Sequence, residues 1–83
     1  MKVNVKYFAS IREAIGQSKE SFETDATTLA ALRDELIGKG GAYAESLSRG
    51  RSVRLALNQT MSDESAVLVE GAEIAFFPPV TGG

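Results

Sequence analysis

Apolar and polar residues alternate along the start of the chain. Val3, Val5 and Tyr7 fall on one side of residues 2–9, whereas the other side carries Lys2, Asn4, Lys6 and Phe8. A period of two predicts a β-strand with one buried face. Phe8 is the one large apolar residue on the opposite, polar face. Residues 19–23, Lys-Glu-Ser-Phe-Glu, predict a second strand whose charges suit the edge of a sheet.

Two helices are predicted within the first 41 residues, one between these two strands and one after them. Ser10 and Glu13 have the spacing of a capping box, which predicts a short helix that ends at Gly16. After a cap at Thr27 or Thr28, apolar residues recur at helical spacing: Leu29, Leu32, Leu36 and Ile37. We interpret this stripe as packing against the sheet, ended by Gly38, with Gly40 and Gly41 forming a loop. Tyr43 and Leu47 then predict one or two further helical turns.

The second half of the chain again has the pattern of strands. Val53, Leu55 and Leu57 alternate into a third strand that turns at Asn58 and Gln59. A polar loop at residues 62–65 and a short apolar segment at 67–69 follow. Residues 74–77 are apolar on both faces, which is typical of a central strand that is covered on both sides, or of one whose second face meets another protein.

The predicted order is β-β-α-β-β with one principal helix and short extra helices. That order favours an α+β fold of the β-grasp (ubiquitin-like) class, with a mixed sheet in which the first and last strands pair in parallel at the centre. We predict a domain over residues 1–77 and an extended tail over residues 78–83. A tail that leaves a central strand starts from the most rigid element of the fold.

Length, charge and residue content exclude several classes of function. The chain has 83 residues, which is enough for one small domain, and a formal net charge of -2. The charge argues against a nucleic-acid partner, and no apolar run reaches the roughly 20 residues needed to span a membrane. The alternating N-terminus does not have the pattern of a signal peptide, so we expect a cytoplasmic protein. With no Cys and no His, catalysis by the chain alone and a bound metal are both unexpected.

The chemistry of the chain is concentrated in its last six residues. Pro78 and Pro79 lack amide hydrogens and have fixed φ, so the last strand should end there and the chain continue extended. Gly82 and Gly83 have no Cβ, so the tip can enter a slot that closes on backbone alone. The terminal carboxylate, with a reference pKa of about 3.5, is ionised at neutral pH and needs activation before acyl chemistry.

The ending Phe-Phe-Pro-Pro-Val-Thr-Gly-Gly resembles the C-terminus of molybdopterin synthase small subunits, a family of ubiquitin-like sulfur carriers in molybdenum cofactor biosynthesis. Residues 7–16, 56–60 and 70–74 are similar to further stretches of that family, so the resemblance spans the whole chain. In the last stretch, Glu70 and Ala72 replace the two Asp of the family's Asp-Gly-Asp-Glu-Val turn, whereas Gly71 is kept. A terminal Gly-Gly alone is a weak signal, but together with these stretches it is a specific one.

The resemblance implies how the tail works. In the family, an activating enzyme adenylates the terminal glycine with ATP and Mg²⁺, and a sulfurtransferase supplies sulfur for a thiocarboxylate. The large subunit, in a heterotetramer of two small and two large subunits, then transfers this sulfur to cyclic pyranopterin monophosphate. The dithiolene of molybdopterin results. Transferred to this sequence, Gly83 carries the sulfur and the inserted arm consists of Pro78, Pro79, Val80, Thr81 and Gly82, with no cofactor bound by this chain.

Three apolar residues are candidate contacts for the large subunit. Phe8 and Phe77 fall on the faces of their strands opposite the predicted core, and Met61 follows the turn at residues 58–59. If the two strands are neighbours, these side chains form an apolar patch beside the tail, and such patches usually mark binding surfaces. Burial under a loop is the alternative for each of them, most of all for Met61.

Two other functions are compatible with the pattern. A sulfur carrier for thiazole synthesis or tRNA thiolation would share the fold and the Gly-Gly, but not the Phe-Phe-Pro-Pro run. A ubiquitin-like modifier would instead form isopeptide bonds with lysines of target proteins. Sulfur at the terminus indicates a carrier, and an isopeptide bond indicates a modifier.

Overall fold

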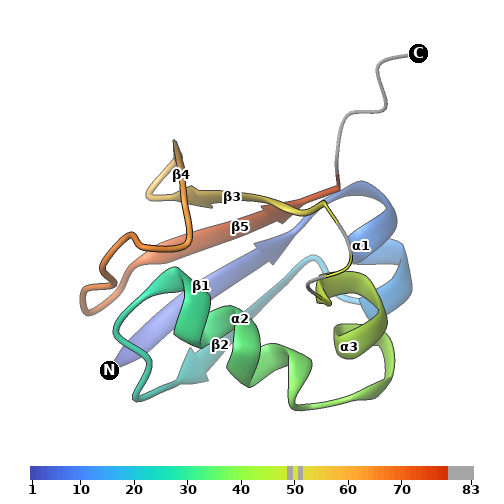
Figure 1. Ribbon diagram of the computed structural model, residues 1–83, viewed down its shortest axis with the longest axis horizontal. Coiled ribbons are helices and arrows are strands. Elements are labelled where there is room, and N and C mark those ends of the chain that lie inside the picture. The colour runs from blue at the N-terminus through green and yellow to red at the C-terminus, as the bar shows by residue number, and fades with distance from the viewer. Residues whose placement is uncertain (49, 51, 79–83) are drawn as a thin grey trace.

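The two stretches with strand patterns near the N-terminus form an antiparallel pair in the computed structural model, which describes residues 1–48, 50 and 52–78. They are β1 (Lys2–Tyr7) and β2 (Lys19–Glu23). β5 (Glu73–Phe77) pairs in parallel with β1 and antiparallel with β3 (Arg54–Leu57), and β4 (Thr60–Ser62) pairs with β3. The sheet order is β2-β1-β5-β3-β4, so β5 is the central strand (Figure 1). The predicted β-grasp architecture, with parallel first and last strands, is therefore confirmed.

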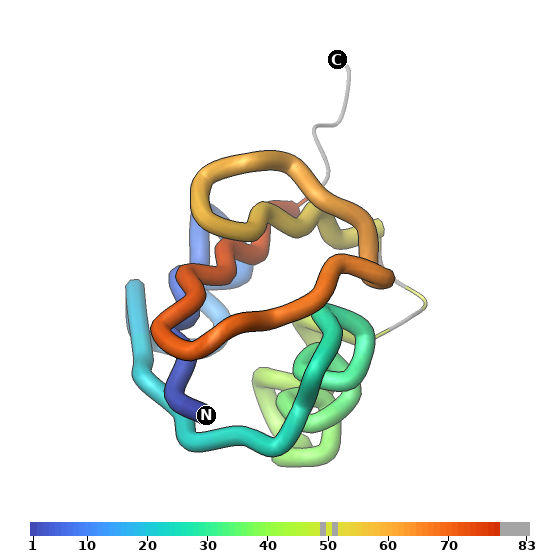
Figure 2. The backbone as a smooth tube through the Cα atoms, turned by 90° about the vertical axis from the view of Figure 1, so that its left-hand side faces the viewer, coloured from blue at the N-terminus to red at the C-terminus, as the bar shows by residue number. Residues whose placement is uncertain are grey.

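One face of the sheet packs against the helices α1 (Ala9–Ile15), α2 (Leu29–Ile37) and α3 (Gly41–Leu47). Figure 2 shows α2 and α3 packed together on one side of the strands, and α3 also contacts α1. The core is made by the buried side chains that these elements share, chiefly Val3, Val5, Tyr7, Ile11, Leu29, Leu32, Leu36, Leu47, Leu55, Ile74 and Phe76. We call the opposite side of the sheet the outer face.

A buried arginine joins two of the helices. Arg33, on α2, is 5% exposed and donates hydrogen bonds from Nε to the carbonyl of Leu47 (2.7 Å) and from a terminal nitrogen to the carbonyl of Ser48 (2.8 Å). These carbonyls lie at the C-terminal end of α3, where a cation is favourable. Glu64 lies 3.6 Å from the guanidinium. The charge is thus compensated, and it holds the end of α3 against α2.

Several predicted boundaries are confirmed. The hydroxyl of Thr28 accepts a hydrogen bond from the amide of Ala31, so Thr28 and not Thr27 caps α2. Gly16 ends α1 with a φ of 86°, in the left-handed region that glycine tolerates best. Asn58 and Gln59 form the turn after β3, both with positive φ. The side chain of Asn58 accepts a hydrogen bond from the amide of Glu73 at 2.9 Å, which ties the turn to the start of β5.

Three sequence-based expectations are wrong in detail. The proposed capping box at Ser10 does not form, because α1 begins at Ala9 and the carbonyl of Phe8 accepts the first helical bonds, so Phe8 occupies the cap position. Gly41 is not part of a loop but the first residue of α3. The chain after the Asn58 turn does not go directly into a loop, because residues 60–62 form β4. This strand was not predicted, since three residues are too few to show an alternating pattern.

Candidate functional site

The root of the tail lies at the end of the central strand. β5 ends at Phe77, and Pro78 is the last described residue of the tail. The predicted site residues Pro79, Val80, Thr81, Gly82 and Gly83 lie outside the described residues. In Figure 1, β5 ends next to α1, and the amide of Phe8, at the start of that helix, donates to the carbonyl of Phe76 at 3.2 Å. This bond fixes the end of β1 to the end of β5.

The structure brings Phe8 and Phe77 together on the outer face. Their rings stack with centroids 4.6 Å apart and planes inclined by 11°. Phe8 remains 39% exposed, and Phe77 is half-buried. Stacked aromatic rings add to their burial about 0.5–1.5 kcal/mol of stabilisation. The pair is a preformed apolar surface within one residue of Pro78.

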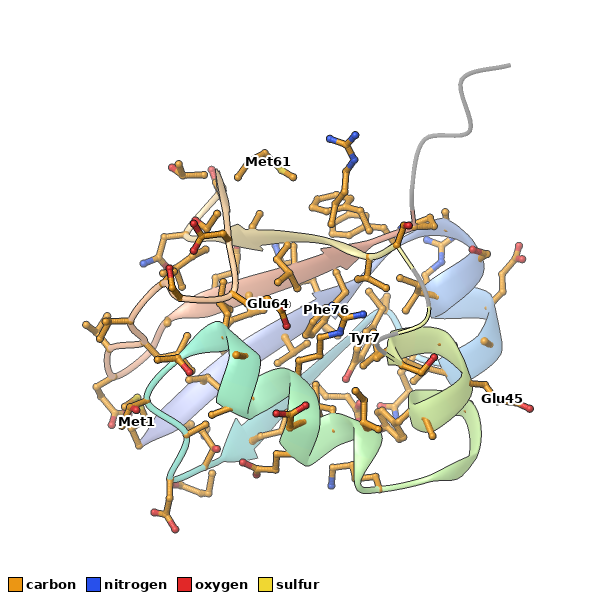
Figure 3. The ribbon with its side chains drawn as sticks, in the orientation of Figure 1. Met1, Tyr7, Glu45, Met61, Glu64 and Phe76 are labelled. Atoms are coloured by element: carbon orange, nitrogen blue, oxygen red, sulfur yellow. The ribbon has the colours of Figure 1, made fainter. Side chains whose placement is uncertain are left out.

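Met61 lies on the same face but farther from the tail. It pairs with Ala56 of β3, which in turn pairs with Ala75 of β5, so these three residues form one row across the sheet. The Met61 side chain is 56% exposed and is therefore not buried under a loop. In Figure 3, Met61 projects away from the helices, whereas Tyr7 and Phe76 lie between the sheet and the helices. We name the set Phe8, Ala56, Met61, Ala75 and Phe77 the outer-face patch.

A network of two tyrosines and one carboxylate supports the patch from the core side. The hydroxyls of Tyr7 and Tyr43 both donate to Oε2 of Glu20, at 2.8 and 2.6 Å. The Tyr7 ring also stacks on Phe76, with centroids 6.2 Å apart. Tyr7 and Phe76 directly precede Phe8 and Phe77 in the chain, so each patch aromatic follows an aromatic residue anchored in the core. The root of the tail is thus held rigidly.

The network also changes the acidity of both tyrosines. Burial and then the bond to Glu20 raise the pKa of Tyr43 to about 12, and the same causes raise the pKa of Tyr7 well above its ordinary value. Both phenols stay protonated at neutral pH and remain hydrogen-bond donors. Glu20 is not among the site residues predicted from the sequence. The alternation of residues 19–23 could have indicated that Glu20 faces the core, because Glu20 and Phe22 fall on the side of β2 opposite Lys19, Ser21 and Glu23.

A cavity of about 190 Å³ lies on the other side of the tail root. Pro78 lines it together with Ile11 of α1 and Val53, and Ser10, Glu45 and Ser46 add polar groups. Among residues 1–48, 50 and 52–78, no cluster of acidic side chains is placed to hold a metal ion. In the same part of the chain, no helix has the length and apolar character needed to cross a membrane. The features that converge here are thus an apolar surface and a tail root.

Comparison with models of known protein families matches residues 5–83 to the ThiS family. The chain belongs to the ThiS family. Among curated relatives, it is 43% identical over 81 residues to the molybdopterin synthase sulfur carrier subunit of Haemophilus influenzae, covering 98% of this chain and 99% of the relative. Its identity to the Escherichia coli protein of the same name is 37%, with the same coverage.

Solved structures of similar fold agree with this membership in the ThiS family. SAMP1 from Haloferax volcanii superimposes with a TM-score of 0.79 at 25% identity, covering 100% of both chains. A chain from the complex of subunits 1 and 2 of molybdopterin-converting factor from Helicobacter pylori has a TM-score of 0.71 at 28% identity, again over 100% of both chains. The β-grasp fold predicted from the sequence is the fold of these ThiS-like structures.

Proposed function

We propose that this chain is the sulfur carrier subunit of a molybdopterin synthase. The observation that carries the proposal is the arrangement at the end of β5: the central strand places Phe77 in a stacked, exposed aromatic pair and continues into Pro78, the root of the Gly-Gly tail. The names of the curated relatives and the Helicobacter pylori complex support the assignment. In this proposal the patch docks on the large subunit while the tail enters its active site, in an assembly of two small and two large subunits.

The proposed chemistry takes place at the carboxylate of Gly83. A carboxylate oxygen attacks the α-phosphorus of ATP, supplied with Mg²⁺ by the activating enzyme, and pyrophosphate leaves. The outer sulfur of a persulfide on a sulfurtransferase then attacks the acyl carbon, and AMP leaves. A thiol attacks the other sulfur of the resulting acyl disulfide, which forms a disulfide and releases the thiocarboxylate of Gly83. In the large subunit this sulfur attacks an oxygen-bearing carbon of cyclic pyranopterin monophosphate, where a carbon–sulfur bond forms and a carbon–oxygen bond breaks. Water then cleaves the acyl–sulfur bond, which restores the Gly83 carboxylate and leaves sulfur on cyclic pyranopterin monophosphate.

The role of the domain in this cycle is positional. The chain contains no Cys and no His, so the partners must supply the nucleophile and the acid–base groups. What the domain provides is a fixed root for the tail, because β5 is paired on both sides and Phe8 and Phe77 are stacked at its end. Holding a reacting group in place supplies a large share of a rate enhancement.

The test is the state of Gly83 in protein purified from its own host after deletion of the large-subunit gene, so that the loaded form accumulates. Iodoacetamide alkylates thiols and thiocarboxylates, and because the chain has no Cys, its C-terminal peptide alone should take the label. Fragmentation of the peptides in the mass spectrometer should place the label on Gly83. It should also distinguish the oxygen-to-sulfur exchange at Gly83 from oxidation of either Met, which adds nearly the same mass. A variant that lacks Gly83 is the control. If the parent host makes molybdopterin and the deletion strain never carries sulfur on this terminus, the proposal is contradicted.

A second candidate function is that of a ubiquitin-like protein modifier. The structural similarity to SAMP1 of Haloferax volcanii, a small archaeal modifier protein, favours it, with a TM-score of 0.79 at 25% identity. The same experiment separates the two candidates. A modifier would be recovered joined through Gly83 to lysines of other proteins, whereas a carrier would be recovered free and sulfurated.

A further inference from the structure

The charged side chains of the outer face can be mapped from the strand register. Directly paired residues share a face, so Lys19 of β2 lies beside Lys6 of β1, and Arg54 of β3 lies opposite Phe77 of β5. Lys19 and Arg54 therefore lie on opposite sides of the stacked Phe8–Phe77 pair, Lys19 on the β2 edge and Arg54 on β3. Lys19 and Arg54 are both exposed. The two cations form the rim of the patch.

These two cations have no anionic partner in the described part of the chain. Lys6 differs from them, because its Nζ lies 3.1 Å from Oε1 of Glu73. α1 adjoins the patch and carries one exposed cation and one exposed anion, Arg12 and Glu13. These two charges cancel, so the net charge beside the patch does not change. The half of the outer face next to the tail thus carries two exposed cations that form no ion pair with a described residue.

The other half of this face has more carboxylates than cations, because Glu23 and Glu70 accompany Lys2 there, in addition to Glu73, which pairs with Lys6. Glu23 pairs with Lys2 in the register, and Glu73 pairs with Asn4, both on the side of the sheet away from the tail. Glu70 accepts a hydrogen bond from the amide of Lys2 at 3.1 Å and also lies at this end. The chain as a whole has a net charge of -2. The cationic rim is therefore a local feature that opposes the charge of the whole molecule.

We propose that the surface that covers the outer-face patch is rimmed by carboxylates facing Lys19 and Arg54, and that this pairing steers docking of the large subunit. The inference rests on the proposed function, and names the chemistry of the partner surface. Two stacked rings form an apolar contact with little directional preference, so they do not fix how the partner is rotated about the tail. Two separated cations do fix it, and rim charges act mainly on the association rate and on its dependence on salt.

The experiment measures association of this chain with the large subunit from the same organism, by stopped flow, across a series of salt concentrations. Arg54→Glu and Lys19→Glu should each slow association at low salt by about three- to tenfold, with little difference from wild type at high salt, because screening removes the steering. Arg54→Lys keeps the charge and should retain the wild-type rate. The matched control is Lys39→Glu, the same charge change at an exposed residue that lies against Phe22 of β2, away from the patch.

The outcomes separate this inference from the proposed function. Slowed association in the two rim variants alone, removed by salt and absent in Arg54→Lys, supports a carboxylate rim. Wild-type association that does not depend on salt, or equal slowing in Lys39→Glu, would overturn the inference and leave the carrier function standing. Faster association of Arg54→Glu would show a cationic partner rim and would also overturn it. A wild-type chain that does not bind the large subunit at all would overturn the proposed function and this inference together.

Discussion

Phe8→Ala separates the binding role of the outer-face patch from its contribution to folding. The backbone of Phe8 is extended, with φ of -124° and ψ of 151°, which alanine adopts without strain. Its amide bond to the carbonyl of Phe76 does not involve the side chain and should persist. The substitution therefore removes the ring and its stack on Phe77, and leaves the joint between β1 and β5 in place.

The structure sets the expected cost to the isolated domain. Truncation of a fully buried Phe to Ala costs about 3–5 kcal/mol. Phe8 is already 39% exposed, so we expect about 1–2 kcal/mol, including the lost stacking. For a domain of this size, each kcal/mol lowers the melting temperature by about 4–8 °C. The variant should thus melt roughly 5–15 °C below wild type and remain folded at room temperature.

The expected cost to binding is larger. Loss of a central interface anchor costs about 2–4 kcal/mol, and each 1.4 kcal/mol is about tenfold in Kd. Calorimetric titration of the large subunit should therefore give a Kd roughly thirtyfold to several hundredfold weaker than wild type. Val67→Ala is the matched control, because Val67 is 66% exposed and lies outside the patch. A folded Phe8→Ala variant that binds within about threefold of wild type would refute the patch as the docking surface.

Further predictions concern the core network, the Asn58 turn and the tail. Tyr7 and Tyr43 are the two tyrosines of the chain and both have a raised pKa, so a spectrophotometric titration of the folded protein should show little phenolate near pH 10. Because the pKa values are raised only in the folded state, the free energy of unfolding should fall as pH rises from about 10 toward 12. A full phenolate step near pH 10 in the folded protein would contradict the network. Asn58→Ala loses the bond to the amide of Glu73 and places alanine at a φ of 50°, which should cost about 1–3 kcal/mol in denaturant unfolding; an unchanged midpoint would show that the turn contributes nothing to β5. Deletion of Gly83 should leave the melting temperature unchanged and abolish sulfur loading, because the carboxylate retreats by up to about 3.5 Å; loading of the shortened chain would refute this role.

The sequence was sufficient where one physical effect determined the pattern. Alternation in residues 2–9 correctly separated the buried Val3, Val5 and Tyr7 from the exposed Phe8, because a strand exposes alternate residues on each face. The two-sided apolar character of residues 74–77 identified the central strand. Alternation put Phe8 and Phe77 on the faces opposite the core, but their contact was predicted only on the condition that the two strands are neighbours, which β1 and β5 are. That the patch binds a partner stays a prediction.

The sequence was insufficient where tertiary contacts decided the outcome. Ser10 and Glu13 have the right spacing for a capping box, but the bond from Phe8 to Phe76 holds residue 8 at the cap position and places Ser10 inside the helix. The charge of Glu20 suggested an exposed edge, whereas two tyrosine hydroxyls satisfy it from β1 and α3. The opposite positions of Lys19 and Arg54 about the Phe8–Phe77 pair follow from strand register, which local patterning alone does not specify.

The most direct test of the central claim follows one sulfur atom. The chain is loaded at Gly83 with isotopically labelled sulfur, purified, and mixed with the large subunit and cyclic pyranopterin monophosphate in a single turnover without ATP. We predict that the label leaves the protein as molybdopterin forms, that Gly83 returns to a carboxylate, and that labelled sulfur is found in the dithiolene. Molybdopterin that forms without the label, while the thiocarboxylate stays on Gly83, would contradict the account.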